Sequence, residues 1–346
     1  MRFPYLVFLS TLSLIGISAC SDQSSPSQEE TANSTRAAVE SFLPAQALEE
    51  ETLLVEAFRS GDLNASEFLD RMAAFATHPD PDVVIGSTQQ LDFIYDEFPD
   101  LHRGLARHVN RTYGRVYRAA RAADTDDAKA ISAGLGGIMA REGNDQEARN
   151  YLIRQGSLYL ELDPTREDLK PTVPLHLLES AFVQTLRARP DIAFELLLTL
   201  VGEGEVSEAS DALQALAASS DPDLIDQLFN VPFLASHGFS GEQIDTLFSE
   251  LWTHPLGRDR TWEFLKANLE GSEGAQGETM LLDIVPLIAS QFCSAERQGE
   301  VLALFQSHGS NLPEQTETME SILVDIQDCI EFRQTQGPSL IAALSQ

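Results

Sequence analysis

The sequence predicts an all-α protein built from many amphipathic helices. In residues 244–252 and 319–330, among others, apolar side chains recur three, four, seven and eight positions apart, which is the spacing of one helix face. Residues that favour helix starts and stops separate these segments. Few stretches are rich in Val, Ile, Thr and Tyr, and no convincing run alternates apolar with polar residues. The pattern therefore argues against a β-sheet.

The N-terminal segment is set aside first, because it has the features of a secretion signal. Arg2 is followed by the apolar run 3–17, which is too short to cross a bilayer as a helix, since that needs roughly 20 residues. The run ends at Ile17-Ser18-Ala19-Cys20. This tetrapeptide resembles the processing site of bacterial lipoproteins, in which the Cys is acylated and becomes the first residue.

We therefore expect residues 1–19 to be a lipoprotein signal peptide and Cys20 to carry the lipid that anchors the chain to a membrane. The alternative is an ordinary signal peptide that ends near a chance Cys. Ser21 follows Cys20, and the absence of Asp at this position favours the outer membrane, facing the periplasm. Residues 20–36 are polar and cannot bury enough surface to order themselves, so we expect a flexible tether.

The charge of the chain limits its partners. Removing residues 1–19 leaves 22 basic and 54 acidic residues, a formal net charge of −32. Such a surface repels the phosphates of nucleic acids and the headgroups of anionic lipids. We expect no nucleic-acid partner, and the only membrane contact that we expect is the lipid anchor.

Helix starts are well marked in the rest of the chain. Asp80-Pro81, Asp163-Pro164 and Asp221-Pro222 each place a capping Asp before a Pro at the first helical position. Residues 240–243, Ser-Gly-Glu-Gln, form a capping box. We expect roughly sixteen helices of about 8–20 residues, paired into a curved or bowl-shaped solenoid of the HEAT or armadillo type over residues 37–346. A compact bundle is the competing architecture.

Two cysteines remain in this domain, Cys293 and Cys329. In an oxidising compartment they could form a disulfide. Two buried free thiols are the alternative, since cysteines are common in protein cores. The sequence leaves both open.

Several motifs are similar to the C-terminal helical domain of the aminopeptidase N family, which includes the endoplasmic reticulum aminopeptidases. The clearest are residues 254–258 (HPLGR) and 262–268 (WEFLKAN), followed by 292–297 (FCSAER). His254 replaces the first Asn of the family pattern, and Thr261 replaces an Ala. The resemblance implies a bowl of HEAT-like helix pairs, which in the family closes over a separate catalytic domain and helps to receive peptide substrate.

The catalytic motifs of that family are missing from this sequence. Its zinc site needs H-E-x-x-H on a helix, and none of the seven His residues is followed by Glu. Its substrate-anchoring G-x-M-E-N is missing too, because Gly137-Ile138-Met139 continues with Ala140-Arg141. The resemblance therefore implies the fold without the activity, and we expect no enzyme, no metal and no cofactor.

One feature of the sequence suggests a binding site. Six arginines recur every three or four residues and cover one face of a helix: Arg103, Arg107, Arg111, Arg115, Arg118 and Arg121. In one interpretation the stripe pairs with acids on neighbouring helices and adds little stability. In the other it receives anions on the concave wall, such as a peptide C-terminus or an acidic loop of a partner.

The function predicted from the sequence is a non-catalytic, membrane-anchored module that binds or scaffolds a peptide or protein in the bacterial envelope. A second hypothesis is an accessory helical subunit of a split aminopeptidase, completed in trans by a separately encoded zinc-bearing chain. A third is a purely structural lipoprotein without a specific ligand.

Overall fold

The computed structural model describes residues 43–162, 173–270, 280–308 and 313–345. The expected signal peptide, Cys20, the tether and the Asp163 cap lie outside these residues. The described residues contain helices and no β-strand, so the all-α prediction is confirmed. None of their helices combines the length and the apolar character that a membrane crossing requires.

The described residues begin with a layer of helices joined by short turns. They are α2 (Pro44–Ser60), α3 (Ala65–Phe75), α4 (Pro81–Gly86), α5 (Gln89–Glu97) and, after the 3₁₀ turn Pro99–Leu101, α6 (His102–Ala122). The apolar faces of these helices are buried in a shared core that includes Phe58, Phe68 and Phe75. Burial of these aromatic side chains supplies the main force that holds the layer together.

The middle of the chain stacks further helices onto this layer. They are α7 (Asp126–Ala140), α8 (Gln146–Tyr159), α9 (Leu178–Ala188), α10 (Pro190–Glu203) and α11 (Val206–Ala217). Successive helices pack against each other, α6 on α7, α8 on α9 and α10 on α11. The α8–α9 pair is especially close, since a Cβ built on Gly156 would lie 2.3 Å from Oγ1 of Thr185. Only glycine fits there.

The C-terminal part completes the array. It contains α12 (Pro222–Leu228), α13 (Val231–Ser236), α14 (Gly241–Leu251), α15 (Pro255–Glu270), α17 (Val285–Ala289), α18 (Ala295–His308) and α19 (Pro313–Leu344). A π-helical turn, Met280–Ile284, leads into α17. Trp262 and Phe292 form the centre of a separate apolar core in this part, with their rings edge to face at 5.2 Å.

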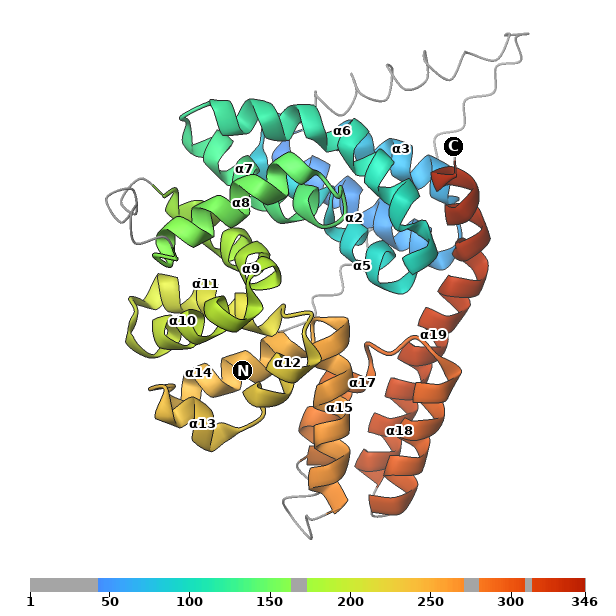
Figure 1. The fold of residues 1–346 in the computed structure, drawn as a ribbon. Helices are drawn as coiled ribbons and strands as arrows, with labels where there is room; N and C mark the ends of the chain where they lie inside the picture. Colours follow the sequence, from blue (N-terminus) through green and yellow to red (C-terminus); the bar gives the residue numbers. More distant parts are fainter. Residues whose placement is uncertain (1–42, 163–172, 271–279, 309–312, 346) are drawn as a thin grey trace, which may run out of the picture.

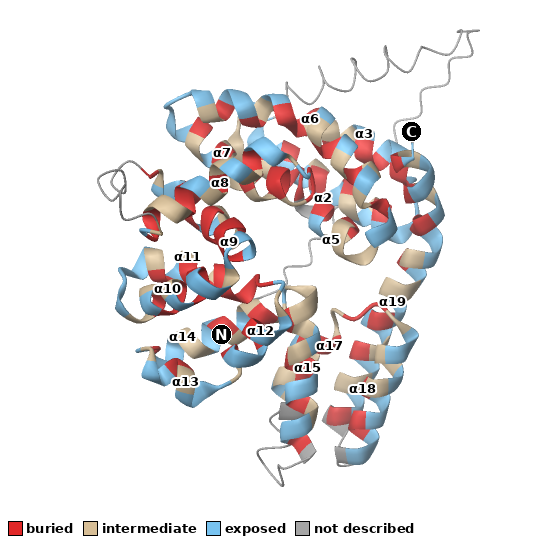
Figure 2. Cartoon of the chain, in the orientation of Figure 1, coloured by how far each residue is buried: buried red, intermediate tan, exposed pale blue. Residues whose placement is uncertain are grey.

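The last helix closes the array into a ring, as Figure 1 shows. The C-terminal half of α19 packs against α2, α3 and α6. Phe332 lies edge to face on Phe58, with ring centroids 5.2 Å apart. The Gln336 amide donates hydrogen bonds to the carbonyl oxygens of Phe58 and Leu63, both at 3.0 Å. Figure 2 shows the buried residues on the faces that the helices turn to one another.

The predicted caps within the described residues are confirmed. The carboxylate of Asp80 accepts from the backbone N–H of Asp82 at 3.0 Å, and Asp221 caps α12 in the same way. The capping box at Ser240 is present.

The predicted helix lengths were less accurate. Four helices, α4, α12, α13 and α17, have fewer than eight residues, and α19 has 32. Helix α19 continues through Pro338, although Pro provides no N–H for the helix, because its flanks are packed on the N-terminal layer.

Candidate anion-binding pocket

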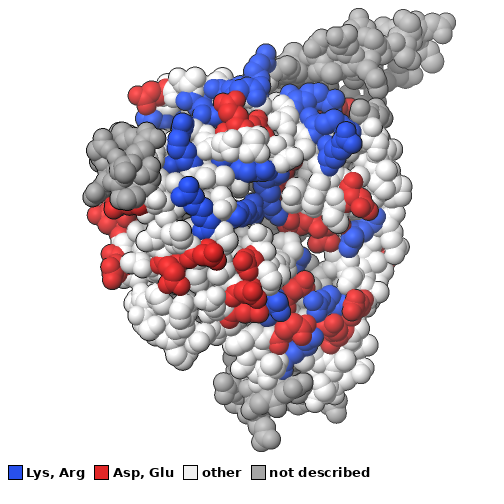
Figure 3. Space-filling model, viewed as in Figure 1, with Lys and Arg blue, Asp and Glu red and all other residues white. Residues whose placement is uncertain are grey.

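The candidate site is a pocket of about 620 Å³ at one edge of the helix stack. Helices α7 and α9 end at this edge and α6 and α8 begin there, because neighbouring helices run antiparallel. Four arginines line the pocket, one from each of these helices or its cap: Arg103, Arg141, Arg149 and Arg187. In the view of Figure 3, Lys and Arg side chains gather over this part of the molecule, and Asp and Glu side chains are more frequent below it.

Arg141 is neutralised within the protein. Its guanidinium forms an ion pair with Asp96 on α5, and it also lies 3.6 Å from Asp92 and 3.3 Å from Glu142. It stacks over the ring of Tyr95, 4.7 Å from the centroid. Burial, and then the Asp92 carboxylate, raise the pKa of Glu142, so Glu142 holds a proton at neutral pH. Arg141 is therefore already paired with acidic residues of the protein, and its role is to form part of the pocket wall.

Arg149 is held by hydrogen bonds to the protein. It donates to the carbonyl oxygen of Ala140 at 2.9 Å and to Oδ1 of Asn144 at 2.7 Å. Asn144 has a positive φ of 46°, which Asn tolerates better than most residues. These bonds fix the turn between α7 and α8, so Arg149 also contributes mainly to the wall.

Arg103 and Arg187 are different, because neither forms an ion pair or hydrogen bond with the described residues. The side chain of Arg187 reaches solvent, yet protein surrounds it on most sides, and this burial together with the charge of Arg141 lowers its pKa. Arg187 also lines a second pocket of about 390 Å³ with Ser219 and Ser220. These two guanidinium groups are available to an anion.

Gln184 adds a neutral polar group to the pocket. Its side chain is only 4% exposed, and it lines the pocket one turn before Arg187 on α9. Its amide has no hydrogen-bond partner among the residues that the structure describes. Because an amide both donates and accepts hydrogen bonds, Gln184 can pair with a ligand that carries a donor and an acceptor.

His254, in the turn between α14 and α15, does not line the pocket but lies near enough to feel the charges of its arginines. Burial, followed by the charges of Arg141 and Arg187, lowers the pKa of His254 to about 4. The imidazole is therefore neutral at pH 7, and it adds no charge to this region.

The comparison with protein families agrees with the fold. The family model of the ERAP1-like C-terminal domain matches residues 54–328. The chain belongs to this family. The resemblance to the C-terminal helical domain of the aminopeptidases is thereby confirmed. None of the curated proteins that were compared matches the chain.

The ERAP1-like C-terminal domain is the non-catalytic part of an aminopeptidase. Within the described ranges of this chain, no group of three or more His, Cys, Asp or Glu residues is arranged to hold a metal ion. The four arginines of the pocket offer donors and no acceptor, so they suit an anion rather than a metal ion. Such a lining can accept an anionic group together with a neighbouring polar group.

The arginine stripe predicted from the sequence is split by the ERAP1-like fold. Of its six members only Arg103 lines the pocket. Arg107 donates to the carbonyl oxygen of Leu344 at 2.8 Å. Arg121 lies 3.4 Å from Glu147 and stacks over Tyr151 at 3.8 Å. The stripe therefore contributes one residue to the candidate site and two, Arg107 and Arg121, to contacts within the protein.

The remaining stripe residues lie away from the pocket. Arg111 is near enough to Asp70 to lower the pKa of that carboxyl, although burial raises it more. Arg115 and Arg118 are exposed. The pattern in the sequence did not indicate four further lining residues, Arg141, Arg149, Arg187 and Gln184. Arginines at the ends of alternate helices, as at Arg141 and Arg187, could have been noticed, since such ends meet at one edge of a stack.

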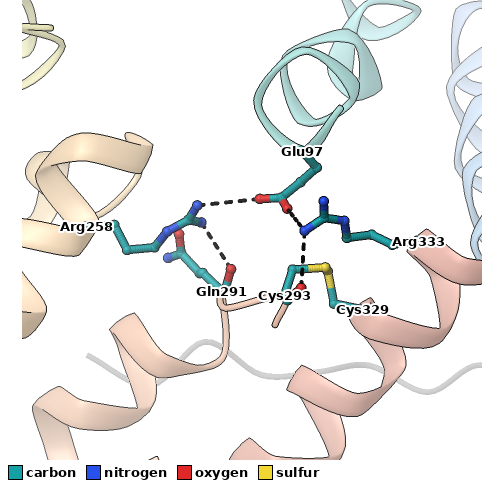
Figure 4. The surroundings of a disulfide bond; sticks show 6 residues. All are labelled: Glu97, Arg258, Gln291, Cys293, Cys329 and Arg333. Atoms are coloured by element: carbon teal, nitrogen blue, oxygen red, sulfur yellow. Dashed lines mark hydrogen bonds and ion pairs between the residues drawn. A yellow bond between two sulfur atoms is a disulfide. The ribbon is translucent and has the colours of Figure 1, made fainter. Parts of the chain in front are cut away.

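The two cysteines among the described residues are joined in the structure. Cys293 and Cys329 form a disulfide with their Cα atoms 5.1 Å apart. Figure 4 shows it beside Glu97, Arg258 and Arg333. The bridge ties the turn before α18 to α19, next to the place where the ring closes.

Proposed function

We propose that this chain is a non-catalytic, lipid-anchored binding module of the bacterial envelope, whose pocket receives the carboxylate of a peptide or protein segment. The observation that carries the proposal is that two pocket arginines, Arg103 and Arg187, form no ion pair or hydrogen bond with the described residues and lie beside the amide of Gln184. Family membership supports it as well, because the matched domain is the non-catalytic part of a peptidase.

The chemistry of the pocket suits a peptide end. Guanidinium groups bind carboxylates through paired, charge-assisted hydrogen bonds. The amide of Gln184 can pair with a peptide group, donating to its carbonyl and accepting from its N–H. A volume of about 620 Å³ lies within the range of small-ligand sites, so the pocket can hold the last few residues of a chain.

The net charge of the protein does not oppose this ligand. The formal charge is −31, but charges more than about 8 Å away are largely screened at physiological salt. The arginines at the pocket therefore dominate the potential that a carboxylate meets there. We expect binding to weaken as salt increases.

Anchoring is a separate part of the proposal. The tetrapeptide Ile17-Ser18-Ala19-Cys20 supports lipid attachment at Cys20 and a location in the outer membrane, facing the periplasm. Mass spectrometry of the N-terminal fragment of the protein from membranes tests it. A fragment that begins at Cys20 with added acyl mass supports the anchor, and an unmodified Cys20 rejects it.

The binding role is tested with a fluorescent peptide of five residues that has a free C-terminal carboxylate, and with its C-terminally amidated twin. We expect the free acid to bind and the amide to bind at least about tenfold more weakly, because it lacks the charge that the arginines recognise. Arg187→Gln should lose about tenfold in affinity for the free acid. Arg154→Gln, an equal change of charge at an exposed site outside the pocket, should leave binding unchanged.

Equal affinity of the acid and the amide would reject the proposal. So would equal losses in Arg187→Gln and Arg154→Gln, since they would mean that only the general charge matters.

Family membership also favours a second candidate, an accessory subunit of a split aminopeptidase. In that case the chain should co-purify with a separate zinc-bearing chain. Hydrolysis of an aminoacyl reporter should appear only when the two are combined. Purification of this chain alone from membranes, with no such companion, would count against it.

A further inference from the structure

The place where the ring closes is a cluster of charges around Glu97, the last residue of α5. The Glu97 carboxylate lies 3.6 Å from Arg258 of α15 and 3.4 Å from Arg333 of α19. One acid from the N-terminal layer therefore holds two arginines from the C-terminal part. We call Glu97, Arg258 and Arg333 the latch (Figure 4).

The same two arginines are oriented by one turn of the backbone, between α17 and α18. Arg258 donates to the carbonyl oxygen of Gln291 at 3.1 Å, and Arg333 donates to that of Cys293 at 3.3 Å. Cys293 is bonded to Cys329, which precedes Arg333 by four residues, or about one helical turn. The disulfide thus holds this turn against α19, where its carbonyl groups meet the latch.

The latch contributes more to geometry than to stability. The Glu97 side chain is only 12% exposed, and burial raises its pKa more than Arg258 and Arg333 lower it. Ion pairs of this kind offset the cost of desolvation and add little beyond it. Their main effect is to fix where the end of α5 lies relative to α15 and α19.

The end of α5 also forms part of the pocket. Tyr95 lines the pocket and stacks on Arg141, and Asp96 forms an ion pair with Arg141. Tyr95, Asp96 and Glu97 are consecutive, so the residue that closes the latch directly follows two that shape the pocket wall. A shift of α5 at Glu97 moves that wall.

We propose that the Cys293–Cys329 disulfide regulates the pocket through α5. The oxidised bridge holds the latch, the latch holds α5, and α5 keeps Tyr95 and Asp96 against Arg141, so that the pocket is ready for its ligand. Reduction releases the turn at residues 291–293, loosens α5 and weakens binding. This regulation rests on the proposed function, which supplies the ligand. The coupling between the disulfide and α5 can be measured without any ligand.

The reductant is a dithiol. One of its thiolates attacks Sγ of Cys329, the more exposed residue of the pair, forms a mixed disulfide with it and releases the Cys293 thiol. The second thiolate of the reductant then displaces the Cys329 thiol. The protein gains two electrons and two protons, and the reductant becomes a disulfide.

The test compares the full-length protein with and without dithiothreitol. Hydrogen exchange is followed in residues 89–98 and 140–145, and affinity is measured with the free-acid peptide described above. We expect reduction to raise exchange in both segments and to weaken binding about fivefold or more, a typical size for coupling between two sites. Glu97→Gln, with the bridge intact, should have the same effects.

Two controls separate the latch from general effects. The double variant Cys293→Ser, Cys329→Ser should resemble the reduced protein and should not respond to dithiothreitol. Glu147→Gln makes the same charge change in the exposed ion pair with Arg121 and should behave as the unchanged protein.

The outcomes are distinct. If alkylation shows that the bridge is reduced, while exchange in residues 89–98 and peptide affinity stay the same, the regulation is wrong. If exchange rises but neither form binds the peptide, the coupling through α5 holds and the proposed ligand is rejected.

Discussion

Two pairs of arginines in this ring of helices differ in whether they form ion pairs with the protein. Arg258 and Arg333, at the latch, share the buried carboxylate of Glu97. Arg103 and Arg187, at the pocket, form no ion pair with the described residues. All four come from helices far apart in the chain. The difference teaches that the role of an arginine here is set by whether the fold places a carboxylate beside it.

Helix α5 decides much of this difference. Its acids Asp92 and Asp96 neutralise Arg141, and its last residue closes the latch. The acids of this short helix therefore pair with one arginine of the pocket wall, Arg141, and with the two arginines of the latch. The pocket arginines that it does not reach remain available to a ligand.

The largest effect is expected where α19 packs on the N-terminal layer, beside the latch. Phe332 is 7% exposed and contacts the rings of Phe58, Phe93 and Phe98. Phe332→Ala should lower the free energy of unfolding by about 3–5 kcal/mol, because it removes buried apolar surface and leaves a cavity. Urea denaturation measures this loss. Ile341→Ala, on the same helix but 52% exposed, should cost little, and equal losses would contradict the packing at the closure.

Glu51 sharpens the comparison, because it is a buried acid that forms no ion pair with an arginine of the described residues. Its side chain is 5% exposed, Oε1 has no hydrogen-bond partner among the described residues, and burial raises its pKa to about 8. The folded protein keeps this proton from about pH 4.5 to pH 8, whereas the unfolded chain loses it. The free energy of unfolding should therefore fall by about 2 kcal/mol over that window, with solvent screening reducing the full value.

Urea denaturation at several pH values measures this fall. Glu51→Gln should remove it and be the more stable protein at pH 8. Glu56→Gln, at an exposed site on the same helix, should keep the slope of the unchanged protein. A slope that survives in Glu51→Gln would assign the effect to another group.

The direct comparison of the two arginine pairs gives the smallest effects. Arg258→Ala removes an ion pair and a hydrogen bond and leaves Glu97 with Arg333 alone, so it should cost about 2 kcal/mol of unfolding free energy. Arg187→Ala should change it by less than about 0.5 kcal/mol, because no described residue depends on it. Both are measured by urea denaturation. Similar losses in the two variants would mean that the pocket arginine has a structural partner after all.

Local patterns in the sequence were enough for the fold class and for many helix starts. The 3.6-residue period of the apolar positions and the capping side chains at Asp80, Asp221 and Ser240 depend only on neighbouring residues, so they can be read along the chain. The motifs around residues 254–268 likewise indicated the family that the comparison then showed.

The pocket, the latch and the closure of the ring were decided by tertiary structure. The six arginines of α6 looked like a site because they are periodic, yet only Arg103 lines the pocket. Arg187 and Gln184 carry no periodic pattern, and Glu97 is one of 54 acidic residues. Which charges meet depends on the packing of helices separated by up to a few hundred residues, and no local pattern encodes that distance.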